Sequence, residues 1–181
     1  SLMVLDVGPG DIVLTTNFSF FATAGVVARL NATPVFVDID PENFNIDPEQ
    51  LRFTLAEMDE QRRKRVKALI PVHLYGQCAN MAEILKIAET FNIPVIEDCA
   101  QAIGAECEIN GKIRCAGSMG DFGCFSFFPS KNLGGIGDGG IVTVNKPKLS
   151  ELLRLKRIHG AERIYYHRMI GGNFRLDPIQ A

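Results

Sequence analysis

The feature that most constrains this chain is the regular alternation of short β-rich runs with helical segments. Strands are predicted at residues 12–15, 34–37, 67–72, 93–96, 122–127 and 140–144, and helices at about 21–30, 47–58, 81–91 and 147–158. Parallel neighbouring strands need a crossover connection, which a helix usually supplies. The order of elements therefore predicts an α/β fold, with a mostly parallel sheet covered by helices on both faces.

Local signals mark where some of these elements begin or turn. Asp47 followed by Pro48 is a helix start, with Asp as the cap and Pro at the first helical position. The dipeptide Asn110-Gly111 favours a type I′ turn, so residues 105–115 are predicted to form a small surface hairpin. Ser1–Leu5 is typical of the end of an apolar helix, and we expect the true start of the protein to lie upstream.

Charge and size narrow the class of protein. The 181 residues are 46% hydrophobic, which is enough for one buried core, and the formal net charge is only −2. No long basic tract occurs, so neither a nucleic acid nor a membrane surface is expected as a partner. The cluster Arg62–Arg65 follows several acidic residues, and we expect it to be a solvated loop of mixed charge.

The cysteines and histidines give no metal or disulfide pattern. Five cysteines contain no C-x-x-C pair, which favours reduced thiols in a cytoplasmic protein. His73, His159 and His167 lack the spacing of metal ligands, so no metal is assigned. No signal-peptide pattern and no apolar run of transmembrane length is present.

Gly135–Gly140 matches the pattern G-x-G-x-x-G, which in a strand-turn-helix context marks a dinucleotide-binding fold. Here a β-rich run follows the glycines instead of a helix. We therefore interpret the segment as a glycine-rich turn that allows close approach of the backbone. A nicotinamide-dependent oxidoreductase, which rests on this match alone, is the weakest functional hypothesis.

Polar residues follow two of the predicted strands. Asp98 comes after the strand at 93–96, and the turn Ser126–Lys131 comes after the strand at 122–127. Ligands of parallel α/β sheets bind beyond the carboxyl ends of strands. The sequence therefore predicts that Asp98 and this turn can meet at one crevice.

Several segments, taken together and in order, resemble the DegT/DnrJ/EryC1/StrS family of sugar aminotransferases. The segments are Phe18–Thr23, Thr33–Asp38, Pro71–Gly76, Glu97–Gln101, Gly120–Lys131 and Gly171–Gln180. The resemblance implies the large domain of a fold-type I pyridoxal-phosphate (PLP) enzyme over residues 1–181. It also implies that this domain is incomplete, because the family's upstream phosphate-binding loop and its small carboxy-terminal domain are not in this sequence.

The resemblance assigns roles at the reacting centre. Lys131 matches the lysine that forms an imine with PLP and that moves protons during transamination. Asp98 matches the carboxylate that keeps the pyridine nitrogen of PLP protonated, and the protonated ring is the electron sink. Gln101, three residues after Asp98, matches a polar contact near the ring oxygen.

The resemblance also implies contacts around the rest of the cofactor. Ser126 matches a ligand of its phosphate, and Phe20 matches the aromatic residue that stacks on its ring. A core phenylalanine is the alternative for Phe20, with Phe18 and Phe21 close by. Asn173 matches an asparagine that reaches the phosphate of the other subunit's cofactor, which implies a homodimer with shared sites.

The function implied is PLP-dependent transamination of a nucleotide-linked keto sugar to an amino sugar, with glutamate as the amino donor. Residues 158–167 resemble the subset of the family that acts on nucleotide-linked sugars. Two alternatives remain open. Some relatives are PLP-dependent sugar dehydratases, in which histidine replaces the lysine, so Lys131 favours transamination. Others are thought to be non-catalytic regulatory or sensor proteins, which the intact set of Lys131, Asp98 and Gln101 disfavours.

Overall fold

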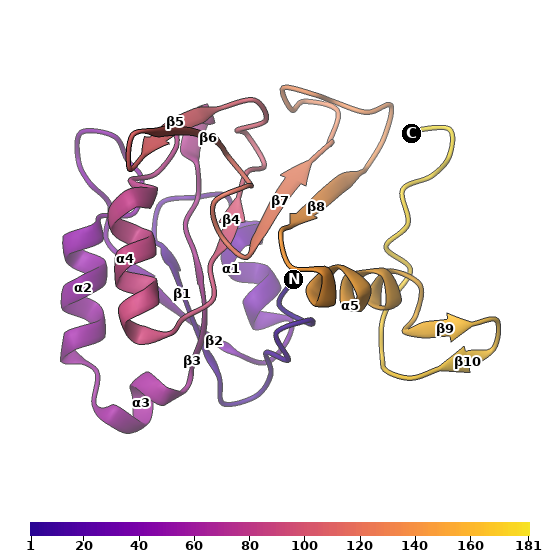
Figure 1. Cartoon of the computed structure of the whole chain (residues 1–181), viewed down its shortest axis with the longest axis horizontal. Coiled ribbons are helices and arrows are strands. Elements are labelled where there is room, and N and C mark those ends of the chain that lie inside the picture. The colour runs from indigo at the N-terminus through magenta and orange to yellow at the C-terminus, as the bar shows by residue number, and fades with distance from the viewer.

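A mostly parallel sheet forms the central layer of the computed structural model, which describes all 181 residues (Figure 1). Its strands are β1 (Ile12–Thr16), β2 (Thr33–Val37), β3 (Val66–Ile70), β4 (Ile96–Asp98), β7 (Phe122–Ser126) and β8 (Gly140–Val144). They pair as β2-β1-β3 and as β4-β7-β8, and parallel bridges from Leu69 to Val95 and from Val72 to Asp98 join β3 to β4. Only β8 runs antiparallel to its neighbour.

Helices cover both faces of this sheet, as the alternation of elements predicts. They are α1 (Phe21–Ala28), α2 (Pro48–Glu57), α3 (Glu60–Lys64), α4 (Met81–Phe91) and α5 (Pro147–Arg157), with a 3₁₀ turn at Leu74–Gly76. Two antiparallel hairpins complete the fold, β5 (Glu106–Ile109) with β6 (Lys112–Cys115), and β9 (Ala161–Arg163) with β10 (Tyr166–His167). Helices α2 and α4 lie side by side on one face, and α1 and α5 lie on the other.

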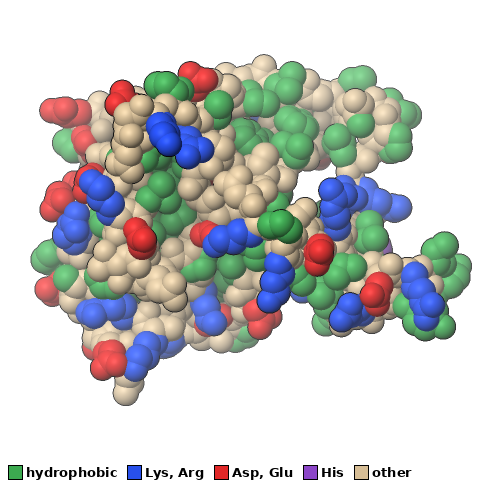
Figure 2. Space-filling model, viewed as in Figure 1, with side chains coloured by type: hydrophobic (Ala, Val, Ile, Leu, Met, Phe, Trp, Pro, Cys, Tyr) green, Lys and Arg blue, Asp and Glu red, His purple; other side chains and the backbone are tan.

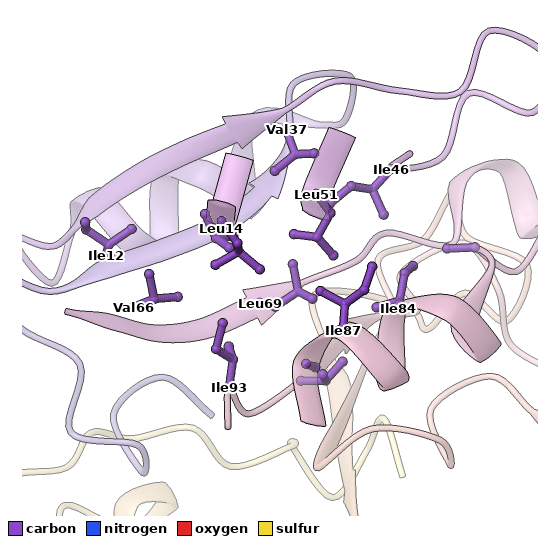
Figure 3. Packing of buried hydrophobic residues seen from close by; sticks show 14 of the residues in the cluster. Ile12, Leu14, Val37, Ile46, Leu51, Val66, Leu69, Ile84, Ile87 and Ile93 are labelled. Carbon is purple, nitrogen blue, oxygen red and sulfur yellow. The ribbon is translucent and has the colours of Figure 1, made fainter. Parts of the chain in front are cut away.

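Alternation along the strands builds a core on each face. In β1, Ile12 and Leu14 belong to a cluster of 16 buried residues beneath α2 and α4, whereas Val13 belongs to a cluster of nine on the side of α1. Figure 3 shows Leu14, Leu51 and Leu69 converging from β1, α2 and β3. Successive side chains of a strand point to opposite faces of the sheet, so each strand contributes to both cores. The sheet is therefore packed on both of its faces.

Most of the predicted elements are confirmed. Helix α4 and strand β8 begin and end at the predicted residues, and the hairpin turn at Asn110-Gly111 has the positive φ angles, 52° and 74°, of a type I′ turn. Asp47 caps α2 by accepting from the backbone N–H of Glu49 at 2.7 Å. The helix end predicted at Ser1–Leu5 is instead a turn without regular structure.

The cluster Arg62–Arg65 is mostly exposed, as predicted, but it lies in the short helix α3 and at its end, and the prediction of a loop is wrong. Asp59 caps the short helix α3 by accepting from the N–H of Arg62 at 2.7 Å. Arg63 then reaches back to the end of α2, where its guanidinium donates to the carbonyls of Leu55 at 3.0 Å and Met58 at 2.7 Å. Arg63 therefore binds carbonyls that have no helical partner at the end of α2, a role that Arg suits at this position.

Residues 147–181, here called the C-terminal arm, are the least buried part of the molecule. They comprise α5, the β9–β10 hairpin and the segment that leads to Ala181, and the hairpin projects away from the sheet (Figure 1). Helix α5 has no fully buried residue, although Leu149 and Leu153 pack against the sheet. Lys and Arg side chains gather on this arm in Figure 2. No helix in the chain combines the length and the apolar character that a membrane span requires.

Candidate functional site

The carboxyl ends of β4 and β7 lie side by side at one edge of the sheet. The two strands are parallel, with Asp98 opposite Cys124, and Ser126 ends β7 two residues further on. The turn after β7 carries Lys131, whose side chain is half-buried and whose N–H donates to the carbonyl of Phe128 at 2.9 Å. The structure thus brings Asp98 and the Ser126–Lys131 turn to the same edge, as predicted.

Asp98 is fixed by hydrogen bonds to its backbone N–H and carbonyl groups and to both of its carboxylate oxygens. Its N–H donates to the carbonyl of Pro71 at 2.9 Å, and its carbonyl accepts from the N–H of His73 at 3.0 Å. Oδ1 accepts from the N–H of Ala100 at 3.1 Å, and Oδ2 accepts from the hydroxyl of Thr23 at 2.8 Å. A carboxylate has about four acceptor positions, so Asp98 retains capacity for a further donor.

Gln101 lies in the turn after β4 and contacts the loop that follows β3. Its Oε1 accepts from the N–H of Tyr75 at 3.1 Å, which leaves the amide Nε2 group able to donate. Tyr75 has φ 54° and ψ 23°, a left-handed conformation that a bulky residue rarely adopts, and its side chain is 72% exposed. In the sequence, only Gly76 after Tyr75 indicates a turn, so the conformation of Tyr75 was not predictable.

Phe20 immediately precedes α1 and is 76% exposed, so it is not a core phenylalanine. Phe21 is also exposed, and Phe18 lies 6.0 Å from Phe44 between ring centroids. Ser19 and Thr23 flank Phe20 in the chain, and their hydroxyl oxygens are 3.0 Å apart. Phe20 therefore belongs to a segment that a hydrogen bond ties to Asp98, while its stacking role stays a prediction.

Ser126 and the glycine-rich loop lie beyond the end of β7. The Ser126 hydroxyl oxygen accepts from the N–H of Phe128 at 3.2 Å, so its own proton remains free to be donated. A Cβ at Gly134 would collide with the carbonyl of Pro129, so the loop needs glycine where its backbone folds back on itself. Strand β8 follows the match to G-x-G-x-x-G, which confirms the interpretation of a turn.

Asn173 lies apart from these residues, beside the end of α5. An isolated antiparallel bridge pairs it with Ile158, and its Oδ1 accepts from the guanidinium Nε of Arg175 at 2.9 Å. No hydrogen bond links Asn173 to Asp98, Ser126 or Lys131 within the chain. The segment after it does reach the glycine-rich loop, where Oε1 of Gln180 accepts from the N–H of Ile136 at 2.7 Å.

A buried carboxylate, Glu97, lies next to Asp98 and was not among the predicted site residues. Glu97 and His73 are both fully buried and lie 3.0 Å apart between Oε2 and Nε2. Nδ1 of His73 accepts from the N–H of Ala79 at 3.1 Å, so Nε2 carries the proton that is donated to Glu97. The only sequence signal was an acidic residue at an otherwise apolar strand position.

Glu97 accepts three further hydrogen bonds from the loop that precedes β7. The donors are the backbone N–H groups of Gly117 at 2.8 Å, Met119 at 2.7 Å and Gly120 at 2.6 Å. Burial favours the neutral acid, but the hydrogen bonds from His73 and the loop outweigh it and lower the pKa of Glu97. The carboxylate therefore stays ionised and fastens β4 to this loop.

Cys99 joins His73 and Glu97 in a group whose ligand-type atoms lie within 4.8 Å of one another. The donors of this group are already engaged, because Glu97 accepts four hydrogen bonds and both ring nitrogens of His73 are used. Burial also raises the pKa of the Cys99 thiol, which keeps it protonated and a poor metal ligand. The group is thus a hydrogen-bonded part of the core.

The sequence matches one family model over residues 1–181, described as the DegT/DnrJ/EryC1/StrS aminotransferase family. Two curated relatives align with 100% of this chain and with 46% of their own length. The pleiotropic regulatory protein of Geobacillus stearothermophilus is 52% identical over 181 residues. UDP-N-acetyl-3-dehydro-alpha-D-glucosamine 3-aminotransferase of Acidithiobacillus ferrooxidans is 48% identical over 181 residues. The chain thus spans about half the length of these relatives.

Solved structures share the fold. The crystal structure of a DegT DnrJ EryC1 StrS aminotransferase from Brucella abortus matches with a TM-score of 0.89 at 42% identity, over 99% of this chain and 47% of that one. A Bacillus subtilis protein crystallised with its cofactor PMP bound matches with a TM-score of 0.85 at 30% identity, over 99% of this chain and 38% of that one. Residues 1–181 therefore have the α/β fold of these two proteins.

Proposed function

Because the chain belongs to the DegT/DnrJ/EryC1/StrS aminotransferase family, we propose that the protein is a PLP-dependent aminotransferase of nucleotide-linked keto sugars. One observation carries this proposal. Asp98, with both carboxylate oxygens held, lies at the same sheet edge as the turn that bears Lys131. A fixed carboxylate and an amine at one edge are the two groups that the chemistry of PLP needs most.

The residues at this edge fit the cofactor. Asp98 has acceptor positions left for a protonated ring nitrogen, and Gln101 has a free amide donor for the ring oxygen. The Ser126 hydroxyl can donate to a phosphate, and the exposed ring of Phe20 can lie against the pyridine ring. Lys131 takes part in none of the chain's ion pairs, so its amine is available for covalent attachment.

When bound, PLP supplies an electron sink for the electrons released as a proton leaves the substrate carbon. The negative charge of Asp98 would hold a proton on the ring nitrogen, which would make that sink effective. The amine of Lys131 would accept the proton that leaves the substrate carbon and would then donate it again, acting as base and then as acid. Gln101, Phe20 and Ser126 orient the ring and its phosphate for this transfer.

The substrate and the assembly are part of the proposal. The Acidithiobacillus relative is named for the amination of a UDP-linked sugar, which supports a nucleotide-linked keto sugar as the acceptor. Glutamate is the amino donor that we propose. Asn173 makes no hydrogen bond to the Asp98 edge of its own chain, yet its amide nitrogen is free to donate. A homodimer in which Asn173 completes the partner's phosphate site accounts for both observations.

The first test is to add PLP to the full-length protein, reduce with borohydride and map the adduct by peptide mass. The adduct is expected on Lys131 alone, and Lys131→Arg should remove it while retaining the positive charge. Glutamate should then convert bound PLP to its amine form in the parent protein, and a panel of nucleotide-linked keto sugars should restore PLP. An adduct on another lysine would refute the assignment.

A regulatory role is the second candidate, because the Geobacillus relative at 52% identity is named a pleiotropic regulatory protein. A regulator that retains the fold would bind PLP but would not catalyse transamination. The glutamate half-reaction separates the two functions, since a sensor would show the Lys131 adduct but no conversion to the amine form.

A further inference from the structure

We propose that Thr23 is a positioning residue for the cofactor, through the hydrogen bond between its hydroxyl and Asp98. This inference rests on the proposed function, because it concerns how Asp98 is held for the ring nitrogen of PLP. Thr23 lies on α1 and is buried, and its Oγ1 donates to Oδ2 of Asp98 at 2.8 Å across 75 residues of sequence. The bond joins the segment of Phe20 to the end of β4.

The direction of the hydrogen bonds is fixed by counting protons. A threonine hydroxyl carries one proton, which Thr23 gives to Asp98, an acceptor when ionised. The Ser19 hydroxyl, 3.0 Å from Thr23, must therefore be the donor of the bond between them. The result is a directed chain from Ser19 to Thr23 to Asp98, in which each bond strengthens the next.

This chain fixes the plane of the carboxylate. Val27, one turn after Thr23 on α1, is fully buried in the core that lies on this side of the sheet, so α1 cannot shift freely relative to β4. Branching at Cβ restricts the rotation of Thr23 further. With Ala100 holding Oδ1 and Thr23 holding Oδ2, two donors from different elements define how Asp98 faces its ligand.

The same segment carries Phe20, the residue expected to lie on the cofactor ring. Helix α1 has no side-chain cap at Phe20, so the hydroxyls of Ser19 and Thr23 are the polar groups that tie its first turn to the sheet. Loss of the Thr23 hydroxyl is therefore expected to loosen two cofactor contacts at once, the ring-nitrogen contact of Asp98 and the stacking contact of Phe20.

The test compares Thr23→Val, which keeps the shape but removes the hydroxyl, with Thr23→Ser, which keeps the hydroxyl. Both are made in the full-length protein. Thr23→Val is expected to weaken PLP binding about tenfold or more, the typical effect of losing a hydrogen bond to a charged group, and to move the visible absorption band of bound PLP. Thr23→Ser is expected to restore both properties toward the parent values.

Further variants distinguish positioning from a structural role. Ser19→Ala should weaken PLP binding in the parent, but should add little in the Thr23→Val background, since the chain of hydrogen bonds is already broken. Parental affinity and an unmoved band in Thr23→Val would overturn the inference, as would defects that Thr23→Ser does not rescue. Absence of the Lys131 adduct in the parent would instead refute the proposed function.

Discussion

Glu97 and Asp98 are consecutive carboxylates with opposite surroundings. The alternation along β4 turns Glu97 toward the face of α4 and Asp98 toward the face of α1. Glu97 is sealed in the core with four donors, whereas Asp98 is half-buried and keeps acceptor capacity. The first carboxylate thus has a structural role, and the second is available for a ligand.

Replacing Glu97 with Gln should destabilise the fold by about 3–5 kcal/mol, the usual result of breaking a buried charged network. The amide presents one acceptor oxygen and turns an NH₂ group toward donors such as Gly117 and His73. Urea unfolding measures the loss. Glu108→Gln, at an exposed position of β5, is the control and should change the free energy of unfolding by less than about 0.5 kcal/mol.

Acid should remove the same stabilisation. The pKa of Glu97 is lower in the folded state than its ordinary value of 4.5, so its contribution is complete above that value. The contribution is lost as pH falls from the ordinary value through the lowered one, because the unfolded chain then binds the proton first. Unfolding free energies measured across this range should fall less steeply in Glu97→Gln than in the parent, and equal slopes would contradict the prediction.

At the residue scale, only part of the site was predictable. Asp98 and Ser126 end strands and Lys131 follows one, and the rule for carboxyl ends of parallel strands brings them to one edge. Thr23 and His73 contact their partners through side-chain hydrogen bonds across 75 and 24 residues. No local pattern encodes such pairs, because both residues also occur as ordinary core or cap residues.

At the scale of elements, strong local signals were predictive and short elements were not. Helix α4 has a regular apolar stripe and the cap Asn80, so its limits were visible in the sequence. Helix α3 has five residues and depends on Arg63 reaching the end of α2, while β10 has only two residues. Elements this short are formed by their tertiary contacts and leave no periodicity to detect.

The cap of α2 gives a prediction at this scale. Asp47→Ala removes the acceptor for the N–H of Glu49 and should lower the free energy of unfolding by about 1 kcal/mol. The effect should appear in global unfolding, because Leu51 and Leu55 of α2 are fully buried in the larger core. Asp47→Asn keeps an acceptor and should lose less, as measured by urea unfolding. An equal loss in both variants would show that the cap is not the cause.

At the scale of the whole molecule, burial is unevenly distributed. The sheet is packed on both faces, whereas the C-terminal arm exposes large apolar side chains, among them Ile164, Tyr165 and Ile170. Local unfolding follows the density of buried contacts. The arm should therefore open at lower free energy than the centre of the sheet.

Hydrogen exchange followed by mass spectrometry tests this expectation. In the 181-residue chain, amides of β3 and α4 should exchange slowest and those of the C-terminal arm fastest. In the full-length protein, the proposed homodimer should slow exchange in the arm more than in α4. Equal protection of the arm in both forms would contradict a role for it in assembly.

The register of β4 decides which of its two carboxylates is buried. Loss of one residue between Ile93 and Ile96 would move Asp98 into the pocket of His73, and gain of one residue would move Glu97 to the place that faces Thr23. Variation in length should therefore be tolerated at the exposed β5–β6 turn but not in this strand. Homologous chains can differ in the amino acids of this strand, but the number of residues in it should be the same.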